Sequence, residues 1–405
     1  MKKITKWKET IKALILYPFI RQKITNLDAN IFFFFPQYQT GGAERVHLNI
    51  MKSVAESRPT CFITDLSVNH DLRDEFKRYA RLINLHRWGW KTSFRKKMAK
   101  QLAAEINKIE KPIVFGSNSE FFYDLLPYLK ASCVKIDLLH TDLSHLPLSI
   151  ENYAVPVTSS LTQRVLLGEG HKEKLKAFYQ RKGIPKQEIE KVRIIPNGIP
   201  IPPDPPPVKD YSGNLTVLFV GRNSHEKRPE LFLKIAAEAL RQNLPFSFQM
   251  IGDFESFAKN KPDNLQIIGK IKDVHKLNEH YRNAHFIFIT SLFEGFPMVI
   301  SEGMAQGVIP MATDVGEIRM DINQKKNTGF IIPSFADADD IVDGFINKMQ
   351  EVTKNRDKLR AIAYNGYQLA KAKFSDEMFR KRYRNLLTQQ FSLSVIVIIV
   401  SKFIL

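Results

Sequence analysis

The sequence predicts an α/β protein made of two Rossmann-like domains that face each other across a cleft. From Asn30 onward, short apolar runs alternate with longer amphipathic segments, which is typical of parallel strands covered by helices. A proline-rich stretch interrupts this alternation near the middle of the chain, and the alternation then starts again. Ligands of open parallel sheets bind beyond the carboxyl ends of the strands. The loops after the strands are therefore the candidate functional segments.

Six strands are expected in each domain. Those of the first domain are 31–35, 60–64, 113–115, 134–139, 155–158 and 192–195, and those of the second are 216–220, 247–251, 265–268, 286–290, 308–311 and 330–332. Residues 199–210 contain six prolines, which exclude a helix or a central strand and favour a stiff connection. The predicted division is a basic extension (1–29), an N-terminal domain (30–207), a C-terminal domain (208–372), a helical segment (373–390) and an apolar tail (391–405).

Composition and charge indicate a folded globular protein with a basic first half. A chain of 405 residues that is 44% hydrophobic can form two ordinary domains, so disorder is not expected. The net charge of +18 lies in the first half and the tail, and residues 87–100 hold six basic residues, no acid and three aromatic residues. Such a cluster suits an anionic membrane surface or nucleic acid, and it also suits a solvated helix face. Cys61 and Cys133 form no motif, which indicates a reducing cytoplasm.

Each end of the chain has a short apolar segment. No apolar stretch reaches the ~20 residues that a spanning helix needs. The short run 13–20 follows five lysines, which predicts a basic interfacial helix rather than a signal peptide. The apolar tail 391–405 is interrupted by serines and a lysine, so a monotopic or packing role is expected for it.

The first candidate motif follows the first strand, where Gly41 and Gly42 precede a helical pattern. Paired glycines at a helix start let backbone amides approach an anionic or hydroxyl-bearing ligand. A plain tight turn explains the pair equally well. The pattern G-x-G-x-x-G is missing here, which counts against a dinucleotide site.

The second motif is the segment 221–229, GRNSHEKRP, after the first strand of the second domain. Arg222 stands at the strand end and Lys227 just before the next helix, so both cations can reach one diphosphate. The alternative is that the loop cations pair with Glu226 and Glu230. That alternative suits Arg228 better than Arg222.

The third motif is EGFPMVISE at residues 294–302, directly after a strand. Pro297 is expected in the first helical turn, which places backbone amides at a helix N-terminus, where phosphate is favoured. Glu294 and Glu302 are poor phosphate ligands but good acceptors for sugar hydroxyls. A helix-start acid and a surface acid are the alternative, although Glu302 falls in an otherwise apolar helix.

These motifs together carry a resemblance to a known family. GGAER (41–45), IIPNG (194–198), VGRNSHEKRPE (220–230), IGD (251–253) and EGFPMVISE (294–302) occur in family order over about residues 30–390. The chain resembles a family 4 glycosyltransferase with the GT-B fold. It departs from the family pattern at Ile199 and Pro200, where the family has Val-Asp.

The resemblance implies roles for particular residues. Arg222 and Lys227 bind the donor diphosphate, Glu302 binds the ribose hydroxyls, and Glu294 binds the transferred hexose. The remaining donor contacts come from Gly42 of the other domain and from the backbone of Gly295, Phe296, Pro297, Met298 and Val299. His140, in LLHTD, is expected near the sugar and the acceptor.

The resemblance also implies the chemistry. The family is retaining and metal-independent, so we expect catalysis by Glu294, His140, Arg222 and Lys227 without a cofactor. The triplet Asp337-Ala338-Asp339 resembles a metal motif, but acids at a helix start need no metal. Residues 373–390 resemble the family's final helix, which crosses back to the first domain.

The expected function is the transfer of a hexose-type sugar from a nucleoside-diphosphate sugar to a glycan or lipid-linked acceptor, in surface polysaccharide or lipopolysaccharide synthesis. The expected location is the cytoplasmic face of the cell membrane, in peripheral contact with anionic lipid. A catalytically silent nucleotide-sugar-binding module is an alternative. A basic nucleic-acid-binding protein is a weaker one, because no RRM, KH or zinc-finger signature occurs. The donor base, sugar, acceptor, linkage and oligomeric state are left open.

Overall fold

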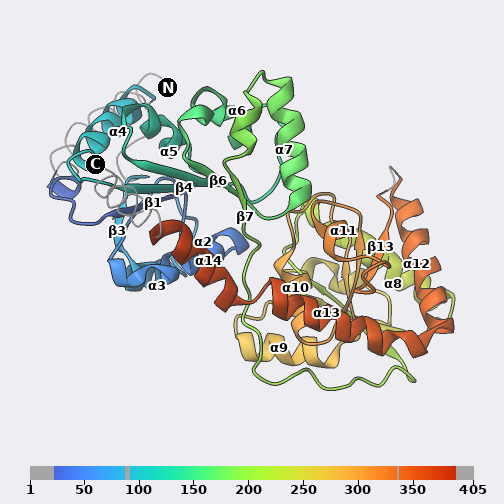
Figure 1. The fold of residues 1–405 in the computed structure, drawn as a ribbon. Coiled ribbons are helices and arrows are strands. Elements are labelled where there is room, and N and C mark those ends of the chain that lie inside the picture. The colour runs from blue at the N-terminus through green and yellow to red at the C-terminus, as the bar shows by residue number, and fades with distance from the viewer. Residues whose placement is uncertain (1–21, 87–91, 335–336, 389–405) are drawn as a thin grey trace, which may run out of the picture. The chain divides into compact units, whose positions relative to one another are not determined.

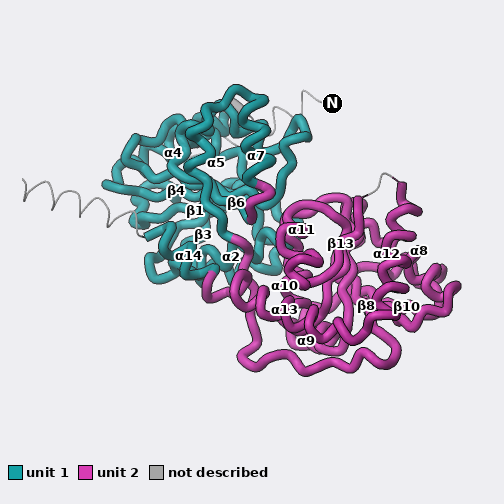
Figure 2. The backbone as a smooth tube through the Cα atoms, turned by 45° about the vertical axis from the view of Figure 1, so that its right-hand side comes forward, with its two compact units in different colours: residues 1–167, 172–195, 379–405 teal, residues 168–171, 196–378 magenta. Residues whose placement is uncertain are grey.

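The structure is a computed structural model, and it describes residues 22–86, 92–334 and 337–388. The predictions for run 13–20, for the tail 391–405 and for residues 87–91 of the basic cluster lie outside these residues. The chain forms two compact units (Figure 2). The first comprises residues 1–167, 172–195 and 379–405, and the second comprises residues 168–171 and 196–378. The proline-rich stretch therefore belongs to the second unit.

The first unit is built on a seven-stranded parallel sheet with the order β3-β2-β1-β4-β5-β6-β7 (Figure 1). Its strands are β1 (Ile31–Phe35), β2 (Thr60–Ile63), β3 (Arg81–Asn84), β4 (Ile113–Ser117), β5 (Val134–Leu138), β6 (Gln163–Leu166) and β7 (Val192–Ile194). Its helices are α2 (Gly42–Ser53), α3 (Arg73–Tyr79), α4 (Thr92–Ile106), α5 (Glu120–Leu125), α6 (Ile150–Ala154) and α7 (Glu169–Arg181).

The central strand β1 has the sequence IFFFF, and all five of its side chains are buried. A strand that is covered on both faces needs apolar residues at every position rather than at alternate ones. Phe34 stacks on Phe62 of β2 and lies 6.0 Å from Phe121 of α5 on one face of the sheet. Phe33 and Phe35 point to the opposite face. Helices therefore cover both faces of this sheet.

Charged side chains are buried within the first sheet. The single Nε–H of Arg164 on β6 is shared between the two carboxylate oxygens of Asp137 on the neighbouring strand β5, each 3.0 Å from Nε. Tyr123 donates to the same carboxylate at 2.8 Å. The two charged residues are 2% and 0% exposed. The pair is thus removed from water, and each nitrogen of the guanidinium has a hydrogen-bond partner in Asp137 or Tyr179.

One strand prediction in this unit was wrong, and two strands, β6 and β3, were not predicted. Residues 155–158 form part of the 3₁₀-helix η4 (Val155–Ser160), whose second residue is Pro156, and the strand β6 begins only at Gln163. The sequence did not indicate β6 because the strand begins with polar residues. A buried Arg164 is expected only once its partner Asp137 is known to be its neighbour. The edge strand β3 was also missed, since it is short and half-exposed.

The second unit contains a six-stranded parallel sheet with the order β10-β9-β8-β11-β12-β13. Its strands are β8 (Leu215–Val220), β9 (Phe246–Ile251), β10 (Leu265–Gly269), β11 (Phe286–Ile289), β12 (Ile309–Thr313) and β13 (Phe330–Ile332). Its helices are α8 (Pro229–Arg241), α9 (Val274–Asn283), α10 (Met298–Ala305), α11 (Ile318–Asp321), α12 (Ala338–Lys354) and α13 (Leu359–Lys373).

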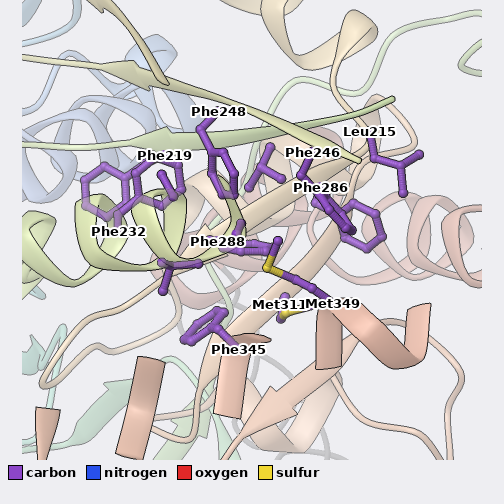
Figure 3. Packing of buried hydrophobic residues seen from close by; sticks show 14 of the residues in the cluster. Leu215, Phe219, Phe232, Phe246, Phe248, Phe286, Phe288, Met311, Phe345 and Met349 are labelled. Atoms are coloured by element: carbon purple, nitrogen blue, oxygen red, sulfur yellow. The ribbon is translucent and has the colours of Figure 1, made fainter. Parts of the chain in front are cut away.

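The core of the second unit lies on both faces of this sheet. One face carries Phe219, Phe248 and Phe288, which pack with α8 and α12; Figure 3 shows their rings together with Phe232 and Phe345 of those helices. The opposite face packs against α9, α10 and α13 through a second cluster of buried residues. Both Rossmann-like domains predicted from the sequence are therefore present.

The connection into the second unit is fixed at two points. Ile199 forms a parallel bridge with Ser375, and its backbone N–H donates to the carbonyl of Phe374 at 2.7 Å. Lys209 donates from its Nζ to the carbonyl of Tyr281 at 3.0 Å and also to that of Ala284, at the C-terminal end of α9. Helix α14 (Asp376–Thr388) then begins in the second unit and belongs to the first unit from Phe379 onward.

Within the part of the chain that the structure describes, no helix is both long enough and apolar enough to cross a bilayer.

Candidate active site

Two loops at the carboxyl ends of neighbouring strands form the core of the candidate site in the second unit. The loop after β8 and the loop after β11 are joined through their backbones, since Leu292 N–H donates to the carbonyl of Glu226 at 2.8 Å. The hydroxyl of Thr290 donates to the carbonyls of Lys227 and Arg228 at 2.9 and 3.0 Å. The backbones of the two loops are thereby held at fixed positions relative to each other.

Arg228 completes this connection. Its guanidinium donates to the carbonyls of Thr290 and Ser291 at 2.6 and 3.0 Å. Its backbone has φ 47° and ψ 56°, in the left-handed region, and it is the N-cap of α8 with Pro229 following. A left-handed backbone at a residue other than glycine costs about 1 kcal/mol or more. The hydrogen bonds of Arg228 offset that cost and place the residue before it, Lys227.

Lys227 and Glu294 form an ion pair across the two loops, from Nζ to Oε1. Their side chains are 25% and 11% exposed, so the pair is partly buried. Solvent and salt therefore screen the attraction between its charges less than they do for a surface pair. The hydroxyl of Ser291 donates to the same Oε1 at 2.7 Å. The structure thus brings together two residues that the sequence places in different motifs.

Arg222 lies on the same loop and is 73% exposed, paired with Glu226 at 3.3 Å. Burial opposes ionisation of Glu226, but its own backbone N–H and the charges of Arg222 and Lys227 lower its pKa overall. Both cations are therefore close to one acid. Pairing within the loop, the alternative that suited Arg228 better than Arg222, is found for Arg222, whereas the guanidinium of Arg228 donates to backbone carbonyls.

Glu302 lies on α10 and is half-buried. Tyr281 of α9, which is 0% exposed, donates its hydroxyl to Glu302 Oε2 at 3.0 Å. Pro297 is the N-cap residue, one position before the first turn in which the sequence placed it. Its side chain has no acceptor, so it cannot cap the first amides of α10. Those amides, from Met298 and Val299, lie at the positive end of the helix dipole.

The loop after β12 packs against residues 294–296. Gly316 has φ +60°, and a Cβ added there would lie 2.0 Å from the carbonyl oxygen of Glu294 and 2.5 Å from that of Gly295. The N–H of Glu317 donates to the carbonyl of Gly295 at 2.9 Å. Phe296 is buried and stacks on Phe374 with ring centroids 4.6 Å apart. Residues 294–296 are therefore held by direct contacts on either side.

The first unit holds the other predicted site residues. Gly42 begins α2, and a Cβ added there would meet nothing within 4 Å, so its backbone is openly accessible. His140 follows β5 and is half-buried. Its Nε2 lies 3.0 Å from Nε2 of His47, a residue of α2 that the sequence did not single out. A single histidine in an amphipathic helix gives no signal of its own, and neither does Tyr281 or Thr290.

Asp337 is the N-cap of α12 and accepts a hydrogen bond of 2.8 Å from the N–H of Asp339. The prediction that these acids begin a helix is therefore confirmed.

Comparisons with known proteins agree with the resemblance. Residues 203–369 match the model of the family described as "Glycosyl transferases group 1". Among curated proteins, a GalNAc-alpha-(1->4)-GalNAc-alpha-(1->3)-diNAcBac-PP-undecaprenol alpha-1,4-N-acetyl-D-galactosaminyltransferase of Campylobacter jejuni is 27% identical over 124 residues. That match covers 29% of this chain and 33% of the relative, so it spans about a third of the curated protein.

Solved structures of the same architecture cover most of the chain. HepE of Anabaena in complex with UDP has a TM-score of 0.67 at 14% identity, and covers 89% of this chain and 100% of that one. The lipopolysaccharide outer core galactosyltransferase WaaB has a TM-score of 0.66 at 18% identity, over 89% and 99%. A glycosyltransferase from Rickettsia africae has a TM-score of 0.67 at 18% identity, over 89% and 100%.

The fold is that of the GT-B glycosyltransferases, with two Rossmann-like domains. Residues 203–369, which match the group 1 glycosyltransferase model, include Arg222, Lys227, Glu294 and Glu302. Membership of family 4 within this class stays a prediction.

Proposed function

We propose that the protein is a retaining glycosyltransferase that moves a hexose-type sugar from a nucleoside-diphosphate sugar to a glycan or lipid-linked acceptor. The observation that supports this most is the Lys227–Glu294 ion pair within a group 1 glycosyltransferase domain. It joins a cation suited to a diphosphate with an acid suited to sugar hydroxyls. A site for the two halves of a nucleotide sugar requires that combination.

In the proposed reaction, the charge that develops on the leaving diphosphate is stabilised by Lys227 and Arg222. The exposed guanidinium of Arg222 can turn from Glu226 to the diphosphate at little cost, since an exposed ion pair contributes about 0–1 kcal/mol. The amides at the start of α10 donate to the same anion or to the sugar. The bond from the anomeric carbon to the diphosphate breaks as the acceptor oxygen bonds on the same face. The diphosphate leaves with the bonding electrons and accepts the proton that the acceptor hydroxyl loses.

Glu294 and Glu302 bind hydroxyl groups in this proposal. Glu294 accepts from the transferred hexose, and its position is set by Ser291 and Lys227. Glu302 accepts from the ribose, and Tyr281 holds one of its oxygens. Gly42 and His140 of the first unit are proposed to contact the donor and the acceptor. Positive charge comes from side chains, so the proposal needs no metal.

The donor and acceptor classes are proposed from the relatives. HepE is described in complex with UDP and with UDP-glucose, which favours a UDP-sugar here. The Campylobacter jejuni relative is named for a substrate linked to undecaprenol, which favours a lipid-linked acceptor in surface polysaccharide or lipopolysaccharide synthesis. Lys96 and Lys100 are exposed on α4 and would attract anionic lipid at the cytoplasmic face of the membrane.

A screen of nucleotide sugars tests this proposal. The full chain is incubated with UDP-sugars and then GDP-sugars, while hydrolysis and thermal stability are measured. We expect one donor to be hydrolysed and to raise the melting temperature, because a ligand that binds only the folded state stabilises it. The anomeric configuration of the first-formed sugar, followed by NMR, tests retention. Stabilisation without turnover would instead support a silent binding module, and salt-sensitive RNA binding without either would support the nucleic-acid alternative.

The variant Glu294→Gln tests the site itself. Removing the carboxylate should lower kcat by about 100-fold, as loss of a transition-state contact does, while UDP affinity changes by less than about threefold. Asp339→Asn is the matched control, since it makes the same chemical change at an exposed residue of the Asp-x-Asp triplet. Equal turnover by Glu294→Gln and the native protein would overturn the assignment.

A further inference from the structure

His47 has a fixed position within the first unit. It lies on α2 and is 0% exposed. Its ring is parallel to that of Phe35, with an interplanar angle of 4° and centroids 4.1 Å apart. Phe35 is itself fully buried at the end of β1. A ring that is stacked and enclosed in this way cannot turn to offer another atom to its neighbours.

The contact between His47 and His140 requires a shared proton. The two Nε2 atoms are 3.0 Å apart, which is a hydrogen-bond distance, and the rings are tilted by 56°. Two bare nitrogens would repel at this distance, and two N–H groups would clash. One histidine therefore donates and the other accepts.

The environment of His47 decides which one donates. Its Nδ1 is buried without a hydrogen-bond partner among the described residues. A buried N–H without an acceptor is rarer and more costly than a lone pair without a donor. Burial, reinforced by the charge that His140 can carry, holds the pKa of His47 well below its usual value, so the ring is neutral. The single proton of neutral His47 therefore belongs on Nε2, which points to His140.

We propose that His47 is a positioning residue: its Nε2–H donates to Nε2 of His140 and thereby holds His140 in the tautomer that carries its proton on Nδ1. A neutral imidazole has one N–H, so Nδ1 becomes the nitrogen from which His140 can donate to a sugar or acceptor hydroxyl. This inference rests on the proposed function for the role of His140, but the tautomer itself does not.

The tautomer is measured directly in the unliganded full chain. In protein labelled with ¹⁵N-histidine, the ring nitrogen shifts of His140, assigned from the variants His140→Gln and His47→Gln, should show a protonated Nδ1 and a bare Nε2. His47→Phe keeps a ring for stacking on Phe35 but removes the donor, and it should shift His140 toward the opposite tautomer. A native His140 protonated on Nε2, or a pattern unchanged by His47→Phe, would overturn the proposal whether or not the protein transfers sugar.

Kinetics separate positioning from packing. With the nucleotide sugar that the screen selects, His47→Phe should lower kcat by about tenfold with little change in KM, because one hydrogen bond that orients a reacting group is lost. His47→Gln offers an amide N–H and should recover most of that loss. Val46→Ala, a control on the same helix, removes buried volume without touching the nitrogen contact. If His47→Phe lowers kcat further in a His140→Gln background, His47 does not act through His140.

Discussion

The two units share one architecture but keep their charges in different places. In the first unit, Asp137 and Arg164 are buried inside the sheet, whereas the polar pair of the predicted site consists of two histidine rings, one after β5 and one on α2. Among the described strands of the second unit, none contains a charged residue, and the cations and acids of the candidate site lie on two loops and on α10. The buried pair of the first unit therefore serves the fold, whereas the charges on the site loops of the second unit lie where a ligand can reach them. Loss of Asp137 should cost stability, and loss of a site charge such as Glu294 should cost activity.

The largest expected effect is on the stability of the first unit. Asp137→Asn leaves the guanidinium of Arg164 buried without its counter-ion, which should lower the free energy of unfolding by about 3–5 kcal/mol. Urea unfolding, followed by probes in each unit, measures this. Asp74→Asn, at a 92% exposed acid of the same unit, is the control and should change stability by less than about 0.5 kcal/mol. A stability loss below 1 kcal/mol for Asp137→Asn would contradict the claim that the buried ion pair stabilises the first unit.

The second effect concerns the loops of the second unit. Gly316→Ala forces a Cβ onto the carbonyl of Glu294 and into a left-handed backbone. We expect a stability loss of about 2 kcal/mol and a fall in kcat of about tenfold or more, because Glu294 is displaced. Gly213→Ala, where an added Cβ meets nothing within 4 Å, serves as the control. Activity equal to that of Gly213→Ala would show that the Glu294 loop tolerates the shift.

The smallest effect depends on pH. Burial lowers the pKa of Lys209 to about 7, whereas the residue in the unfolded chain keeps its proton to about pH 10.4. Between these values the unfolded state binds more protons, so stability should rise with pH. We expect a rise of about 1 kcal/mol from pH 7 to pH 9, less than the full linkage slope, because the end of α9 favours the ammonium.

Lys209→Met provides the comparison, since it keeps most of the side-chain volume and cannot titrate. Its free energy of unfolding should lack the rise over this pH window, as measured by denaturant titrations at several pH values. An identical rise in both proteins would assign it to another group.

The sequence predicts most of the fold because apolar runs mark nearly all buried strands. It fails at β6, where Gln163 and Arg164 are polar, since the compensating Asp137 is a neighbour in space and distant in sequence. Residues 155–158 contain the strand formers Val155 and Val157, but Pro156 at the start of η4 suits a helical turn better.

In the candidate site too, residues that belong to a sequence pattern can be predicted, and residues that depend on a distant partner cannot. Lys227, Glu294 and Glu302 stand in motifs with a visible pattern, so they can be named from the sequence. Arg228 donates to a backbone carbonyl, and Tyr281 donates to a single carboxylate oxygen. Such contacts produce no recognisable spacing of residue types in the sequence. His47 needs both its stacking partner and His140 to be placed before its function can be inferred.

The strand β1 has a consequence for biogenesis. Its four consecutive phenylalanines are covered in the finished protein by β2 and β4, but β4 does not begin until Ile113. A ribosome adds roughly 5–20 residues per second, so this strongly apolar segment stays uncovered for several seconds of translation. A chain truncated before Ile113 would expose a segment prone to cross-β association. Fragments intended for expression should therefore extend beyond β4.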